Sequence, residues 1–117
     1  MRHVIAIAAL IFASSCASQA TIAQNSREAR GREIVEQNCS SCHATGWSGD
    51  SPAPEAPPFR TLSHNYRVDA LEEAFAEGIS VGHPAMPQFA FEPDDVRALV
   101  AYLQSIQNEL PPPPAQQ

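Results

Sequence analysis

Five consecutive residues in the first half of the chain carry the clearest chemistry: Cys39-Ser40-Ser41-Cys42-His43. The order C-x-x-C-H is the pattern for covalent attachment of a c-type haem. Each thiol adds to one vinyl group of the porphyrin, and His43 then lies under the ring, where an imidazole nitrogen can bind the iron. The motif therefore predicts one covalent haem on Cys39, Cys42 and His43, and a haem fixed in a small protein mainly carries electrons.

Two other interpretations of the cysteine pair stay open at this point. Zinc would need two further ligands, usually a second Cys/His pair at short spacing. His64 and His83 are far apart, with no cysteine near them. A redox dithiol of the thioredoxin kind needs a βαβ context, and the chain shows no strand pattern. Both alternatives are disfavoured relative to haem.

A haem held by one histidine leaves a second axial position on the iron. Met86 is the only methionine beyond the N-terminal segment, in a loop stiffened by Pro84 and Pro87 and outside any periodic apolar stripe. A core methionine that fills a gap more often belongs to a helix face. We therefore expect Met86 to be the second axial ligand, with His83 and His64 as competitors. Ligation by His and Met would raise the reduction potential and favour electron transfer over catalysis.

The first 23 residues are expected to be a signal peptide rather than part of the fold. A short basic start precedes a ten-residue apolar run, and small residues follow, with cleavage expected after Ala20 or Ala23. The apolar run is too short to span a bilayer, which needs roughly 20 residues, so no stable membrane insertion is expected. Cys16 weakly resembles a lipoprotein acylation site, which stays an alternative. Export, with the remaining two cysteines both used by haem, predicts a periplasmic protein.

The rest of the chain is acidic. From residue 24 on it has six arginines, no lysine and thirteen acidic residues, a net charge of −7. Nucleic-acid binding needs a basic face, so it is excluded, as is attraction to an anionic membrane surface. An acidic electron carrier would be steered toward a basic patch on its redox partner.

Apolar periodicity predicts an all-α domain over residues 24–110, followed by a Pro-rich C-terminal tail over 111–117. A first helix is expected from about Ser26 to Asn38, capped by Asn25 or Ser26. Gly31 costs helix stability, so it indicates close approach by another element.

Two further helices are expected, over residues 67–78 and from Pro93, where a stripe of apolar residues runs from Val96 to Ile106. Residues 46–58 and 81–91 are expected to be loops. Long loops in a small domain are unusual unless they wrap something, and haem is the obvious candidate.

Together these residues resemble the class I cytochromes c, small monohaem proteins, over roughly residues 29–107. Gly31 and Val35 resemble the family's N-terminal helix, and residues 99–103 resemble the C-terminal helix that crosses it. Met86-Pro87 resembles the distal-ligand loop. Pro57 matches the proline whose carbonyl accepts a hydrogen bond from the proximal histidine, with the adjacent Pro58 as the other candidate.

The resemblance implies a cytochrome c-like fold, three to four helices wrapped around one covalent haem c with the N- and C-terminal helices crossing. It implies a monomeric, periplasmic electron carrier rather than an enzyme, which passes single electrons between redox partners by Fe(III)/Fe(II) cycling. A dedicated haem subunit of an oxidoreductase complex and a haem-based redox or gas sensor are the alternatives. The lysine ring of mitochondrial members is missing. Trp47, Tyr66 and Arg60 are candidates for the haem crevice or its propionates, weighed against ordinary packing or solvation.

Overall fold

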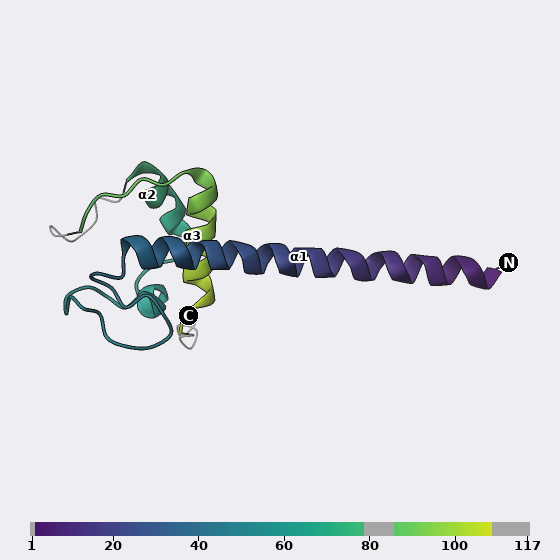
Figure 1. Ribbon diagram of the computed structural model, residues 1–117, viewed down its shortest axis with the longest axis horizontal. Coiled ribbons are helices and arrows are strands. Elements are labelled where there is room, and N and C mark those ends of the chain that lie inside the picture. Colours follow the sequence, from purple (N-terminus) through teal and green to yellow (C-terminus); the bar gives the residue numbers. More distant parts are fainter. Residues whose placement is uncertain (1, 79–85, 109–117) are drawn as a thin grey trace, which may run out of the picture.

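The structure, a computed structural model, describes residues 2–78 and 86–108, with side chains from residue 18 on. Its helices, in chain order, are α1 (Arg2–Asn38), the 3-10 helices η1 (Phe59–His64) and η2 (Val68–Ala70), α2 (Leu71–Glu77) and α3 (Pro93–Ser105) (Figure 1). The described residues contain no strand, which confirms the predicted all-α class.

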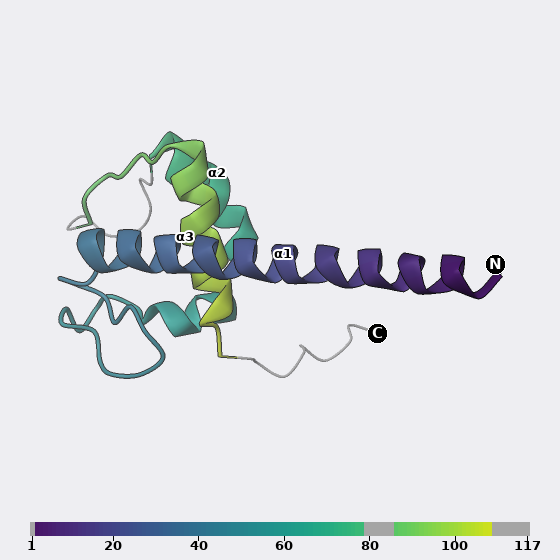
Figure 2. The same cartoon turned by 45° about the vertical axis from the view of Figure 1, so that its right-hand side comes forward.

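The helices α1 and α3 cross, and Gly31 lies at the crossing (Figures 1 and 2). A Cβ atom added to Gly31 would lie 1.9 Å from the carbonyl oxygen of Ala98 and 2.8 Å from Cβ of Tyr102. Only glycine leaves room for this contact, so the predicted close approach is confirmed. The stability that glycine loses inside a helix is offset by the packing of the two helices.

Most of the core comes from the apolar stripe of α3. The side chains of Leu99, Leu103 and Ile106 are fully buried, as is Val35 of α1. The helix begins at Pro93, as predicted, with Asp94 and Asp95 in its first turn, where the helix dipole favours negative charge. The predicted C-terminal helix is therefore confirmed, together with the face that it buries.

The predicted start of the first helix is wrong, because α1 runs without a break from Arg2. Neither glycine nor proline occurs before Gly31, so nothing in the sequence ends a helix there. The Ser26 hydroxyl donates to the Ala23 carbonyl, 2.9 Å away, as a residue inside a helix does rather than as a cap. Among the described residues, no helix is long and apolar enough to cross a membrane.

The middle of the chain departs from expectation in two places. The helix expected over residues 67–78 is divided into η2 and α2, and α2 ends at Gly78, whose φ of 97° is easy only for glycine. The turn η1 was not predicted. Residues 46–58 and 86–91 form no helix, as expected. The rest of the second expected loop, residues 79–85, and the tail over 111–117 lie outside the described residues.

Candidate cofactor site

The C-x-x-C-H motif forms a tight turn at the end of α1. The amide of Cys39 donates to the Val35 carbonyl at 2.9 Å, which continues the helical pattern for one more residue. The amides of Cys42 and His43 both donate to the Cys39 carbonyl, at 3.1 and 2.9 Å. Cys39 is half-buried and Cys42 is exposed. The turn thus holds the two thiols and the imidazole close together on a fixed backbone.

His43 is buried, with 8% of its surface exposed, and its ring is held on two sides. Its Nδ1 lies 2.8 Å from the carbonyl oxygen of Pro57, and the Phe59 ring packs against it with centroids 4.5 Å apart. A carbonyl oxygen only accepts hydrogen bonds, so Nδ1 carries the proton and Nε2 is left as a donor of electrons to a metal. The structure places this bond on Pro57 and not on Pro58.

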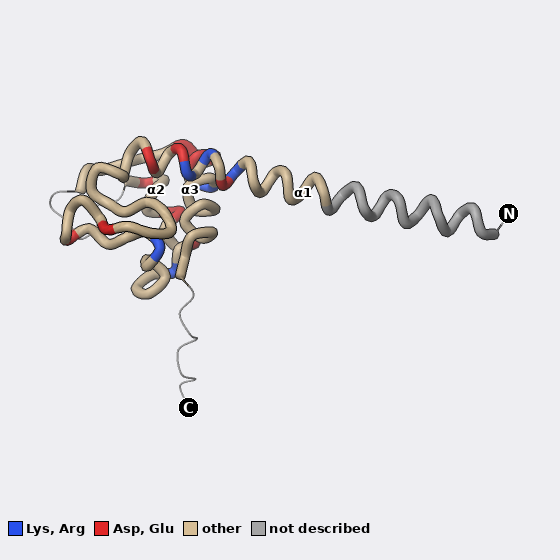
Figure 3. Tube along the Cα trace, turned by 60° about the horizontal axis from the view of Figure 1, so that its bottom comes forward, with Lys and Arg blue, Asp and Glu red and all other residues tan. Residues whose placement is uncertain are grey.

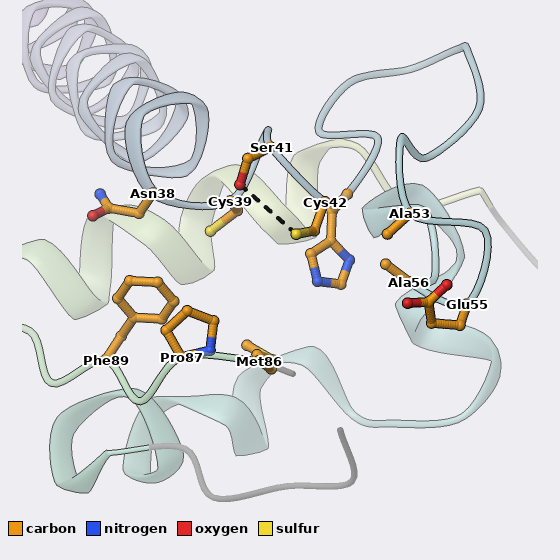
Figure 4. A pocket seen from close by; sticks show the side chains of 11 residues that line it. Asn38, Cys39, Ser41, Cys42, Ala53, Glu55, Ala56, Met86, Pro87 and Phe89 are labelled. Atoms are coloured by element: carbon orange, nitrogen blue, oxygen red, sulfur yellow. Dashed lines mark hydrogen bonds between the residues drawn. The ribbon is translucent and has the colours of Figure 1, made fainter. Parts of the chain in front are cut away.

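Two neighbouring cavities open beside the motif, with volumes of about 310 and 240 Å³. Both are lined by Cys39, His43, Met86 and Phe89, so they meet at these four residues. Figure 4 shows Cys39, Cys42, Met86 and Phe89 around the larger cavity. The smaller cavity reaches the core and has mostly apolar walls from α1, η1, α2 and α3. The combined space therefore has mostly apolar walls, and the sulfur atoms that border it belong to Cys39, Cys42 and Met86.

Met86 enters this space from the chain segment that precedes α3. The segment is tied to α2, because the amide of Phe91 donates to the Phe75 carbonyl at 3.0 Å. The ring of Phe91 packs edge-on against Phe75 and stacks on Phe89, with centroids 6.3 and 5.8 Å apart. These contacts hold the backbone that carries the Met86 thioether.

The two competing histidines lie elsewhere. His64 is exposed at the end of η1 and lines neither cavity. His83 lies outside the described residues. Of the three candidates for a second axial ligand, Met86 is the one that the described structure brings to His43.

Comparison with known proteins agrees with this geometry. The family model described as cytochrome c matches residues 28–107, which is more than half of the chain. The chain belongs to the cytochrome c family. Domains of this family bind haem c covalently, typically one haem per domain, and generally serve as electron carriers. No match was found among curated proteins or among solved structures.

The cavity of this cytochrome fits a covalent haem better than the alternatives. Burial, and then the nearby Cys42, raise the pKa of Cys39 to about 11, so its thiol stays protonated at neutral pH. A reactive redox dithiol needs a lowered thiol pKa, and that of Cys39 is raised. Within the described residues no group of three or more His, Cys, Asp or Glu side chains could hold a metal ion. The zinc and redox-dithiol interpretations therefore lose support.

The three residues considered for the haem crevice, Tyr66, Trp47 and Arg60, differ in position. Tyr66 lines the smaller cavity although 59% of its surface is exposed, so it stands at the cavity's mouth. Trp47 is 64% exposed and lines neither cavity. Arg60 also lies outside both cavities, and its Nη1 is buried without a hydrogen-bond partner.

Phe59 was missed as a site residue. It is the first residue of η1, and its amide donates to the Ala44 carbonyl at 2.9 Å, which brings its ring against His43. Its position two residues after Pro57, the predicted partner of His43, was the available signal.

Proposed function

We propose that this cytochrome c is a periplasmic carrier of single electrons, with haem attached through Cys39 and Cys42 and ligated by His43 and Met86. The observation that carries the proposal is the convergence of these four residues on one apolar space. A covalent haem with His–Met ligation needs two thiols for attachment to the porphyrin, and an imidazole and a thioether as iron ligands.

Each residue has a separate task in this proposal. When bound, haem supplies an Fe(III)/Fe(II) couple. Cys39 and Cys42 fix the group to the end of α1, which prevents its loss. The Nδ1 proton of His43, held by Pro57 at 2.8 Å, sets the orientation of the ring and raises the basicity of Nε2. The thioether of Met86 favours the ferrous state relative to a second imidazole.

The walls of the smaller cavity serve the same end by keeping water away from the redox centre. The rings of Phe59, Phe75, Phe89 and Phe91 all line it. A dry site of low dielectric disfavours the more highly charged ferric state, which raises the reduction potential further. If His43 and Met86 both held the iron of such a haem, small oxidants would have no ready route to it. These features support electron transfer over catalysis.

The periplasmic location rests on the N-terminal segment. Residues 1–23 have the charge, length and small-residue pattern of a signal peptide. Beyond it the only cysteines are those of the motif, so an oxidising compartment would meet no spare thiol once haem is attached.

The redox partner is expected to present a basic surface. Acidic residues occupy the first turns of α2 and α3, and Figure 3 shows acidic residues in red in this part of the chain. A groove between these helices is lined by Asp69, Glu72 and Glu73, with Arg97 beside them. This charge would steer association with a basic partner and would be screened by salt.

Mass spectrometry of the exported protein tests the attachment directly. The intact mass should include one haem, the haem should survive acid–acetone extraction, and the N-terminus should lie after Ala20 or Ala23. Extractable haem would defeat the assignment of Cys39 and Cys42. An N-terminal segment still present, without acylation at Cys16, would defeat the proposed cleavage.

A further inference from the structure

The side chain of Gln107 joins the end of α3 to the segment that follows Pro57. Its Nε2 donates to the carbonyl oxygens of Phe59 and Leu103, at 2.8 and 2.6 Å. Its Oε1 accepts from the backbone amide of Ser63 at 2.8 Å. One half-buried amide thus closes three hydrogen bonds, two of them to η1.

The proximal side of the site depends on η1 for its position. Pro57 and Pro58 have no amide hydrogen, so this stretch donates no backbone hydrogen bond, and the Pro58 carbonyl accepts only within η1, from the Thr61 amide and hydroxyl at 3.0 and 2.8 Å. The next residue, Phe59, bonds outside this stretch: its amide donates to the Ala44 carbonyl, and its carbonyl accepts from Gln107. The Pro57 carbonyl that holds His43 is therefore placed by bonds made at Phe59.

We propose that Gln107 is a positioning residue for the proximal ligand His43. It acts at a distance, through Phe59 and Pro57, by holding the carbonyl that accepts from Nδ1. The inference rests on the proposed function, because it takes His43 as an axial ligand. Without the Gln107 bonds η1 is held there by the Asn108 amide, which donates to the Arg60 carbonyl at 2.8 Å. With η1 held less firmly, the Nδ1–H···O bond weakens and the imidazole becomes a poorer donor. The ferric state then loses stabilisation, and the reduction potential rises.

The variant Gln107→Met, made in the haem-loaded protein, tests this role. Methionine keeps the length and apolar volume of the side chain and removes all three hydrogen bonds. We expect the Nδ1 proton of His43 to exchange with solvent about fivefold faster by NMR in the ferrous protein, the size of effect that one weakened hydrogen bond gives. The reduction potential should rise together with the exchange rate.

A matched control lies at the same end of α3. The Ser105 hydroxyl donates to the Tyr102 carbonyl at 2.8 Å, a bond that stays within the helix. Ser105→Ala also removes a side-chain hydrogen bond but leaves η1 untouched, so exchange and potential should keep their original values. Equal changes in Ser105→Ala and Gln107→Met would overturn the proposal, because the effect would then be general loosening of α3.

A second variant covers the case in which Gln107→Met does not fold. Gln107→Glu keeps an acceptor for Ser63 and loses the donors to Phe59 and Leu103, so it should reproduce the faster exchange and the higher potential. If the exchange rate and the reduction potential are unchanged in Gln107→Glu, the positioning role of Gln107 is overturned and the proposed ligation by His43 is not. A protein without substitution whose His43 shows no haem-bound NMR signals overturns the proposed ligation and this inference with it.

Discussion

The crossing of α1 with α3 and the cavity beside Cys39 share one helix but are built in different ways. At the crossing the chain packs against itself, with the backbone of Ala98 against Gly31 and fully buried Val35 and Leu99 nearby. At the cavity, loops and short helices enclose space that the chain does not fill. The first region follows from ordinary helix packing, whereas the second requires a partner molecule.

The two regions gain stability from different sources. Contacts within the chain stabilise the crossing. The apolar walls of the smaller cavity, which come from α1, η1, α2 and α3, are removed from water when an apolar group binds between them.

Removing the attachment points should have the largest effect on the molecule. A Cys39→Ala, Cys42→Ala double variant cannot retain haem covalently, so the cavity would have to stay empty or collapse. We expect the variant to be largely disordered by circular dichroism. A native-like helical signal would contradict this and would show that the α1–α3 crossing is stable unaided.

Adding a methyl group at position 31, where α1 contacts α3, should have the next largest effect on stability. Gly31→Ala places a Cβ atom 1.9 Å from the Ala98 carbonyl oxygen, so the helices must separate. Overpacking of this kind costs about 1–3 kcal/mol, to be measured by denaturant unfolding of the haem-loaded protein.

Gly46 provides the matched control for this substitution. A Cβ atom added to Gly46 would meet nothing within 4 Å. Gly46→Ala should therefore leave the free energy of unfolding nearly unchanged. Equal loss in the two variants would mean that the crossing is looser than the structure shows.

Met86→Ala probes the cavity side, with an effect mainly on redox chemistry. Loss of the thioether should lower the reduction potential, abolish the charge-transfer band of the Fe(III)–S bond and let carbon monoxide bind the ferrous protein. Met86→His should also lower the potential while keeping the site closed to carbon monoxide.

His64→Ala is the control for Met86, because His64 is exposed and lines neither cavity. Its potential and spectrum should equal those of the original protein. An unchanged spectrum in Met86→Ala would instead return the histidines, including His83, to consideration as ligands.

The same contrast explains what could be predicted from the sequence. The motif at Cys39, the apolar stripe of α3 and the spacing of Gly31 are local patterns, and each carries its own physical signal. The first turn of α1 could not be located, because no residue before Gly31 stops a helix and neither Asn25 nor Ser26 acts as a cap. A cap residue favours a helix start only where the preceding chain leaves the helix.

The 3-10 helix η1 and its contacts could not be predicted from the sequence for another reason. Its hydrogen bonds join Phe59 to Ala44 and Gln107, residues far apart in the chain. No periodicity marks such a segment, since its position is set by tertiary bonds. The choice of Pro57 over Pro58 as partner of His43 likewise needed the folded backbone.

The smallest effect should come from the ion pair that spans the crossing. The guanidinium of Arg30 on α1 bonds the Asp95 carboxylate of α3 in two places, Nε to Oδ1 at 3.0 Å and Nη2 to Oδ2 at 3.2 Å. The hydrogen bond to Asp95 is the main cause that raises the pKa of Arg30, with a further one to Glu33. The Arg30 side chain is 47% exposed and the Asp95 side chain 32% exposed, and ion pairs that water reaches contribute little and are weakened by salt.

Asp95→Asn keeps the shape of the side chain and removes its charge. We expect a decrease in Tm of the haem-loaded protein that is smaller than for Gly31→Ala and that shrinks further as salt is raised. Asp94→Asn is the control, because Asp94 pairs with Arg97 on its own helix and does not reach α1. If Asp95→Asn lowered Tm as much as Gly31→Ala, the charge pair rather than the backbone contact at Gly31 would hold the helices together.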